Sequence, residues 1–151
     1  MSLIVMLDAG PLGLVTNPRR SPASVACAKW LQALVTHGAR TIVPEISDYE
    51  VRRELLRANK VKGLRRLDDL VGHLEYLPLT TAAMRMAAAL WAQARQQGEP
   101  TADDKALDGD VILAAQARTL DVANVVIATT NVGHLSRFVP AALWLDITQP
   151  S

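Results

Sequence analysis

The chain has 151 residues, half of them hydrophobic, and a formal net charge of +1 at pH 7. This length suits one domain with its own core, so we expect residues 1–151 to form a single domain. The apolar runs are too short to span a bilayer and the start does not resemble a signal peptide, so we expect a cytoplasmic protein without a membrane anchor. Cys27 is the only cysteine, which excludes an internal disulfide and a thiolate zinc cluster.

The charges are distributed unevenly along the chain. Between Arg52 and Arg66, seven basic residues accompany one acid, Glu54, which gives this segment a net charge of +6 and leaves −5 for the remainder. Five acids and one lysine lie in residues 99–110. The pattern favours a basic surface near an acidic centre, although solvated helix faces also produce runs of charge.

The first 60 residues predict two strands and two helices. Residues 3–7 form a short apolar run that predicts a buried strand, and Gly10 and Pro11 then indicate a turn. Helical spacing of apolar residues follows at 21–39, and residues 40–44 predict a second strand. Residues 44–60 predict the next helix, with Pro44 suited to its first turn.

The rest of the chain continues the alternation. Helices are predicted at residues 64–74, 80–98 and 110–120, the last of them apolar on nearly all sides and therefore buried. Residues 75–79 fit an edge strand or an extended linker, residues 124–129 predict a strand, and residues 142–148 fit one more. Continuous apolar strands that alternate with helices are typical of a parallel sheet covered on both faces, so the predicted fold class is α/β.

Polar residues follow two of the predicted strands where each one ends. Asp8 follows the first strand, and Thr129 and Asn131 stand at the end of a later one. Ligands of open parallel sheets bind beyond the carboxyl ends of the strands, so we expect these residues to share one edge.

Two predicted helices add carboxylates to this edge. Asp110 shares a helical face with apolar residues, and a buried carboxylate needs a cation or hydrogen-bond donors. Asp108 is either the cap of that helix or a metal contact, and Glu50 lies in the early turns of its own helix. Each acid also has an ordinary explanation, namely a turn, an ion pair or a helix N-terminus. Together they make an oxygen-only donor set, which suits Mg²⁺ or Mn²⁺ better than zinc.

Four segments in this order resemble the PIN domain, specifically the VapC-type bacterial endoribonucleases, over essentially the full chain. These segments are LDAGPL, DYEVRREL, DVILAAQA and TTNVGHLSRF. The resemblance implies a three-layer α/β/α sandwich around a central, mainly parallel sheet of four to five strands. It also implies a homodimer, and clustered acids that hold Mg²⁺ or Mn²⁺ for cutting RNA.

The resemblance assigns roles position by position. Asp8, Glu50 and Asp110 match the family's first three acids, and Thr129 with Asn131 matches the Thr-x-Asn form of its fourth site. Asn131 supplies an oxygen but no charge, so a second metal would need Asp108 or Asp104.

We therefore expect a metal-dependent endoribonuclease, either the toxin of a type II toxin–antitoxin pair with a cognate antitoxin or a solitary nuclease. The acids would hold the ion and take a proton from the attacking water, while Thr129 and Asn131 orient water or phosphate. Salt-sensitive attraction for the RNA backbone would come from a set of arginines: Arg19, Arg20, Arg52, Arg53 and Arg57.

Three other functions are alternatives to this nuclease. The chain lacks the glycine fingerprint of a dinucleotide-binding enzyme, because the segment after the first strand has only Gly10 and Gly13, with Pro11 between them. It also lacks the lysine of a P-loop. A haloacid-dehalogenase-like phosphatase would need an acid where Gly10 stands. A PIN-fold module that binds RNA or an antitoxin without catalysis stays open, and Asn131 favours it.

Overall fold

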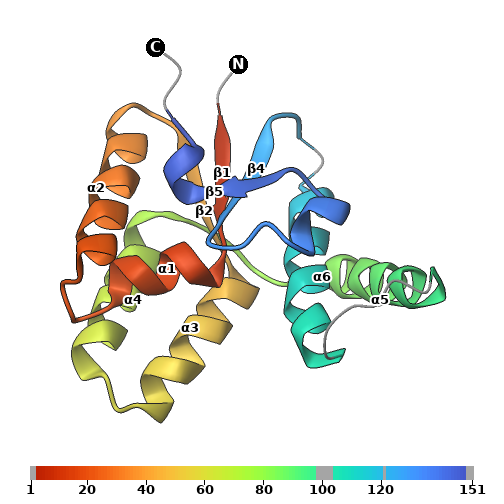
Figure 1. The fold of residues 1–151 in the computed structure, drawn as a ribbon, viewed down its shortest axis with the longest axis horizontal. Helices are drawn as coiled ribbons and strands as arrows, with labels where there is room; N and C mark the ends of the chain where they lie inside the picture. The colour runs from red at the N-terminus through yellow and green to blue at the C-terminus, as the bar shows by residue number, and fades with distance from the viewer. Residues whose placement is uncertain (1–2, 98–103, 121, 149–151) are drawn as a thin grey trace.

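The computed structural model describes residues 3–97, 104–120 and 122–148, and the side chains of residues 104–107 lie outside the description. Its centre is a five-stranded sheet in the order β3-β2-β1-β4-β5, with every neighbouring pair parallel (Figure 1). The strands are β1 (Ile4–Leu7), β2 (Arg40–Pro44), β3 (Glu75–Leu77), β4 (Val125–Thr129) and β5 (Ala141–Leu143).

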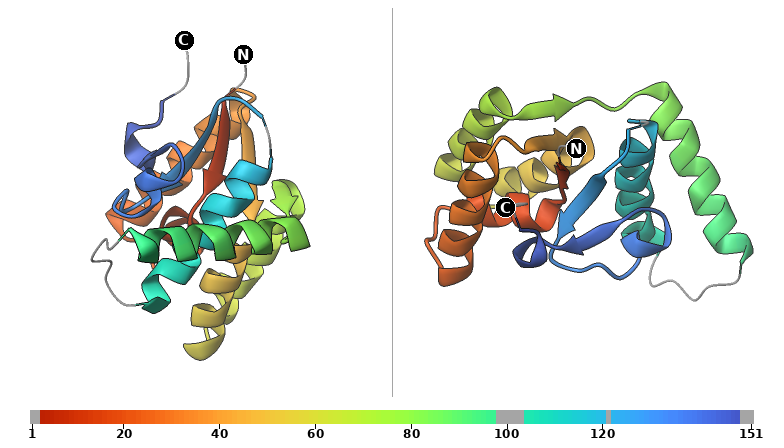
Figure 2. Two further views of the ribbon diagram at one scale, coloured as in Figure 1. Left: turned by 90° about the vertical axis from the view of Figure 1, so that its right-hand side faces the viewer. Right: turned by 90° about the horizontal axis from the view of Figure 1, so that it is seen from above.

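Helices cover both faces of this sheet, which confirms the three-layer α/β/α sandwich (Figure 2). The described helices are α1 (Ala9–Thr16), α2 (Pro22–Thr36), α3 (Glu45–Arg57), α4 (Val61–His73), α5 (Thr81–Gln96) and α6 (Asp104–Thr119). Two short 3₁₀ helices, η1 (Leu135–Arg137) and η2 (Trp144–Asp146), flank β5. No helix within the described ranges has both the length and the apolar character that crossing a membrane requires.

The two faces of the sheet belong to separate hydrophobic cores. Ile4 and Met6 of β1 pack with α5 and α6, whereas Val5 and Leu7 pack with α1, α2 and α4. Successive residues of a strand point to opposite faces, so burial on both faces explains the uninterrupted apolar runs of the strands. Helix α3 joins both cores and projects beyond the edge where β1 ends (Figure 1).

The turn that the sequence predicted after Asp8 is wrong, because the chain enters α1 at once. Asp8 is the N-cap of this helix, and its Oδ1 accepts a hydrogen bond from Ala9 N at 2.7 Å. Pro11 fits the first turn, where a backbone donor has no partner within the helix. Gly10 packs so tightly against Thr130, the residue after β4, that a Cβ would lie 2.5 Å from Thr130 Oγ1. The glycine therefore serves a close approach and not a turn.

Two further element boundaries differ from the sequence prediction. The last strand, β5, ends at Leu143, and the chain continues as η2 where an extended strand was predicted to residue 148. Helix α6 begins at Asp104, six residues before the predicted start, so Asp108 is an internal helix residue and not a cap. Residues 75–77 do form an edge strand, β3.

A buried amide connects α6 with the start of α3. Gln116 is 1% exposed, and its Oε1 accepts a hydrogen bond from Ile46 N at 3.2 Å. Its Nε2 donates to Leu77 O at 2.9 Å. Gln116 thus fixes α6 against the first turn of α3 and the end of β3.

Replacing this amide should destabilise the fold. Gln116→Leu leaves the N–H of Ile46 and the carbonyl of Leu77 without their partner, and each unsatisfied buried group costs about 1–3 kcal/mol. We expect a loss of about 3 kcal/mol in the free energy of unfolding, measured by urea denaturation. Gln32→Leu, at an exposed position of α2, is the matched control. Equal stability of the two variants would contradict the structural role of Gln116.

Candidate active site

The site begins where β1 and β4 end side by side. The chain proceeds from β1 through β2 to β3 on one side of β1, and β4 and β5 lie on its other side. The carboxyl ends of β1 and β4 therefore form the switch point of the sheet, where ligands bind in this architecture. Helices α3 and α6 stand at the same edge (Figure 1).

The register of β1 and β4 places Asp8 against Thr129. Leu7 pairs with Ala128, and Asp8 N donates to Ala128 O at 2.9 Å. One residue further, the buried Thr129 hydroxyl donates to Asp8 Oδ2 at 2.7 Å. With Ala9 N on its other oxygen, the Asp8 carboxylate is held in one orientation.

Glu50 and Asp110 reach this edge from two helices. Helix α3 starts directly after β2, which puts Glu50 in its second turn. Gly109 of α6 passes so close to Glu50 that a Cβ on the glycine would lie 3.2 Å from both carboxylate oxygens. Asp110 follows as the next residue of α6, and both carboxylates are partly buried.

The carboxylates of Asp8, Glu50 and Asp110 lie close enough for their charges to interact. Burial raises the pKa of Glu50, and the charges of Asp8 and, more weakly, Asp110 raise it further against the opposing charge of Arg53. The pKa of Asp110 rises to about 6, first through burial and then through the charge of Asp8, with Arg137 opposing. Asp8 therefore acts on both other acids, and the three converge as the sequence indicated.

The donor set fits a hard divalent cation that keeps part of its water shell. Within the described part of the chain, no three His, Cys, Asp or Glu side chains are grouped so that they could hold a metal ion together. Mg²⁺ is usually bound through one or two carboxylates with several waters retained, so a group of three direct protein ligands is not required. A cation at this edge would also offset the repulsion among the three acids. Asp8, Glu50 and Asp110 are the residues that could hold it.

Asn131 and Asp108 lie differently from the three acids. Thr129 Oγ1 accepts a hydrogen bond from Asn131 N at 3.1 Å, so Asn131 borders the site through its backbone. Its side-chain Oδ1 accepts from Gly133 N at 3.0 Å within its own loop. Asp108 is exposed, and its spacing of two residues from Asp110 puts it on another face of α6.

The five predicted RNA-binding arginines fall into two groups. Arg52 pairs within the fold, with Asp48 at 3.0 Å and Asp68 at 2.9 Å. The other four are exposed: Arg19, Arg20, Arg53 and Arg57. Arg57 pairs with Glu54 at 2.9 Å on the surface of α3, and Arg19 and Arg20 lie between α1 and α2.

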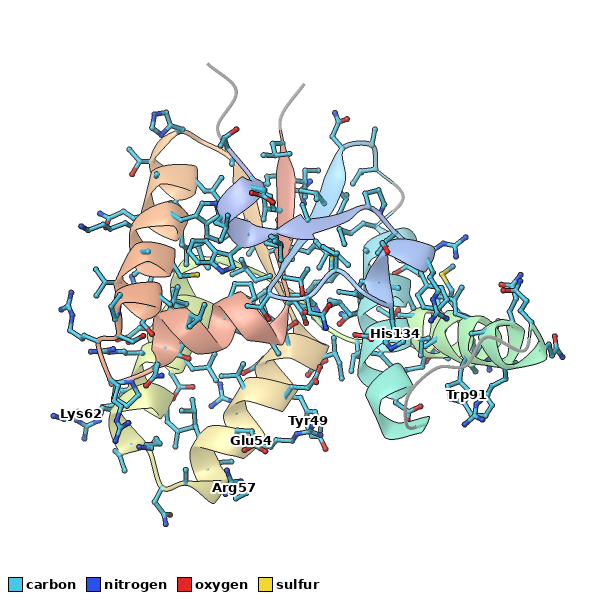
Figure 3. The ribbon with its side chains drawn as sticks, in the orientation of Figure 1. Tyr49, Glu54, Arg57, Lys62, Trp91 and His134 are labelled. Carbon is cyan, nitrogen blue, oxygen red and sulfur yellow. The ribbon has the colours of Figure 1, made fainter. Side chains whose placement is uncertain are left out.

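Sequence reasoning assigned no role to Arg137, although its charge reaches Asp110 and lowers the pKa of that carboxyl. Arg137 belongs to η1, which contacts α6, and its Nη2 donates to His134 Nδ1 at 2.9 Å. Figure 3 labels His134 beside α6. Both residues stand in the segment TTNVGHLSRF, so the available signal was their nearness to Asn131.

Two comparisons with known proteins find matches for this chain. The family model of the PIN domain matches residues 5–135, while comparison with curated proteins gives no match. VapBC2 from Rickettsia felis, bound to a DNA fragment from its promoter, has a TM-score of 0.71 and 16% identity over 94% of this chain and 99% of that chain.

Two other solved structures are similar to a comparable degree. VapBC-1 from nontypeable Haemophilus influenzae has a TM-score of 0.68 and 19% identity over 95% of this chain and 100% of that chain. FitAcB from Neisseria gonorrhoeae has a TM-score of 0.67 and 18% identity over 95% and 99% of the respective chains. These likenesses show a common fold.

The raised pKa of Asp110 predicts a pH-dependent cost to the metal-free fold. Because the folded-state pKa of about 6 exceeds the ordinary 3.8, ionised Asp110 destabilises the fold; this cost is absent below pH 3.8 and complete above about pH 6. In EDTA at pH 7.5, Asp110→Asn should be more stable than the wild type by about 1 kcal/mol after allowance for solvent screening.

Thermal unfolding at several pH values measures this effect. The difference in Tm between Asp110→Asn and the wild type should shrink as the pH falls from 7.5 to 4.5. Asp69→Asn, at an exposed position of α4, controls for the loss of any surface carboxylate. A Tm difference that does not change with pH would contradict the effect.

Proposed function

Because the chain belongs to the PIN domain family, we propose that it is a VapC-like, divalent-metal-dependent endoribonuclease. One observation carries this proposal: Asp8, Glu50 and Asp110 come from three separate elements and interact electrostatically at the switch point of the sheet. Carboxylates whose pKa values are raised by burial and by one another's charge are typical of functional sites. This supports a cation site and a hydrolase.

The side chains have separate roles in the proposed hydrolysis of the phosphodiester bond. Asp8, Glu50 and Asp110 hold Mg²⁺ or Mn²⁺ directly or through water, and the Thr129 hydroxyl keeps Asp8 in place. When bound, the ion acidifies a water and offsets the charge on the phosphate. One of the carboxylates accepts the proton of the water that attacks phosphorus in line, and the ribose oxygen leaves.

The toxin role and its partners extend this proposal. The similar structures are VapBC complexes and FitAcB, one of them bound to promoter DNA, so we propose a type II toxin that binds a cognate antitoxin and pairs with a second copy of itself. The reading frames beside the gene would identify the antitoxin. Light scattering of the purified protein would give the oligomeric state.

A PIN-fold module that binds RNA or protein without catalysis is the second candidate. Asn131 favours it, because its side chain carries no charge and hydrogen-bonds to Gly133 in its own loop. The two candidates differ in whether RNA that binds is also cut.

Cleavage of RNA tests the proposed function and its residues. With Mn²⁺ or Mg²⁺ the purified wild type should cut RNA, and Asp8→Asn should reduce the rate at least about 100-fold, since residues that merely support metal ligands already contribute 10–100-fold. Asparagine still caps α1, so the variant should fold. Glu75→Gln is the matched control, because Glu75 pairs with Arg40 at the opposite edge of the sheet.

Two results would count against this assignment. A wild-type rate in folded Asp8→Asn would refute the role of Asp8. Retention of RNA on a filter without cleavage under any divalent metal would replace the nuclease with the binding module.

The exposed arginines of α3 should provide salt-sensitive attraction for RNA. Replacing both Arg53 and Arg57 by Ala should weaken binding at low salt and make the slope of log K against log salt less steep by about 1.4, because each contact to a single-strand phosphate contributes about 0.7. Arg52 is excluded from the test because its loss would break two internal ion pairs. Arg85→Ala, at an exposed position of α5, is the control, and an unchanged slope in the double variant would contradict the role.

A further inference from the structure

An exposed aromatic residue stands on α3, next in the sequence to one of the three acids. Tyr49 is the residue before Glu50 on α3, and 56% of its surface is exposed. Figure 3 shows the side chain leaving α3 on the side of α6. The packing of α3 does not require this ring, because Ile46 and Val51 are the residues that bury the helix in the two cores.

One face of the ring is covered by a cation. The Arg53 guanidinium carbon lies 5.2 Å from the centre of the Tyr49 ring, a distance at which the cation and the ring attract. Since 56% of the residue remains exposed beside this contact, much of the side chain is still accessible to solvent. Arg53 also lowers the pKa of Glu50, so the stacked pair belongs to the electrostatic surroundings of the acids.

The second arginine–aromatic pair of the described structure shows the contrast. Arg95 lies 4.8 Å from the ring centre of Trp91 on α5. Trp91 is partly buried against a hydrophobic core, and Figure 3 places it far from Tyr49. Packing against the core therefore accounts for the aromatic residue at Trp91, but it does not account for the exposed one at Tyr49.

A groove with cationic residues leads away from Glu50. It lies between α1 and α3, has a volume of about 470 Å³, and is lined by Thr16 and Asn17 on one wall and by Glu50, Arg53, Arg57 and Lys60 on the other. The lining carries three cations, Arg53, Arg57 and Lys60, and two carboxylates, Glu50 and Glu54, and Glu54 is paired with Arg57. A metal ion on Glu50 would leave Arg53 and Lys60 as a net positive charge that attracts phosphates.

We propose that Tyr49 is a base-stacking platform next to the scissile phosphate, so that the substrate is unpaired RNA at this point and its backbone follows the groove between α1 and α3. This rests on the proposed ribonuclease function. Base stacking on an aromatic side chain needs a free base face, which single strands offer and duplexes do not. The guanidinium of Arg53 orients the ring from behind and lies near the backbone of the stacked nucleotide.

Binding measured without cleavage tests the platform. Fluorescence anisotropy in EDTA should use one labelled 12-nucleotide RNA, free or annealed to its complement, with the wild type and three variants. Tyr49→Ala should weaken binding of the single strand about five-fold or more and leave binding of the duplex unchanged. Tyr49→Phe should bind like the wild type, because the ring and not the hydroxyl makes the stack. Leu56→Ala, also on α3 and 57% exposed, removes similar surface without a ring and should have no effect.

Three results would overturn the platform. These are unchanged binding of the single strand by Tyr49→Ala, an equal loss for Tyr49→Phe, and a changed oligomeric state of Tyr49→Ala on size exclusion.

A parallel assay with Mn²⁺ separates this inference from the proposed function. If the wild type binds the single strand through Tyr49 but cuts no RNA, the nuclease fails and the platform stands. If the wild type cuts RNA and Tyr49→Ala binds it normally, only the platform fails.

Discussion

The hydrogen bond from the Thr129 hydroxyl to Asp8 fixes the point from which the rest of the site is built. It exists because Leu7 and Ala128 are paired in a parallel ladder that is buried on both faces. A slip of one residue would send every side chain of β1 to the wrong core, so the register is strongly specified. The position of the Asp8 carboxylate is therefore set by hydrophobic burial along the whole strand.

The same construction offsets the repulsion among the acids. Glu50 and Asp110 are carried by helices that are anchored elsewhere, α3 in both cores and α6 against the sheet. Gln116 adds a hydrogen-bonded link between the two helices, on the α6 turns beyond Asp110. The unfavourable charges are thus confined to one edge, and the stabilising contacts lie behind it.

Local patterns predicted the elements that have local causes. Apolar runs identified β1 and β4, and helical spacing identified α3 and most of α6. Strand ends placed Asp8 and Thr129 at one edge of the sheet, to which two predicted helices were expected to add Glu50 and Asp110. Helix α1 was missed because Gly10 and Pro11 are usual turn residues, and only the contact with Thr130, far away in the sequence, explains the glycine. The ion pair of Arg52 with Asp68 and the effect of Arg137 on Asp110 likewise depend on packing between elements. Such contacts leave no periodic signal in the sequence.

Gly109 determines how closely α6 can pass the carboxylate on α3. Where another residue would carry a methyl group against the Glu50 oxygens, the glycine lets the backbone of α6 lie directly beside this carboxylate. Asp8 is held differently, because donors occupy both of its oxygens. The edge of the sheet thus combines one carboxylate fixed by hydrogen bonds with one that is packed against a neighbouring backbone. A side chain at position 109 would require the Glu50 carboxylate or α6 to shift.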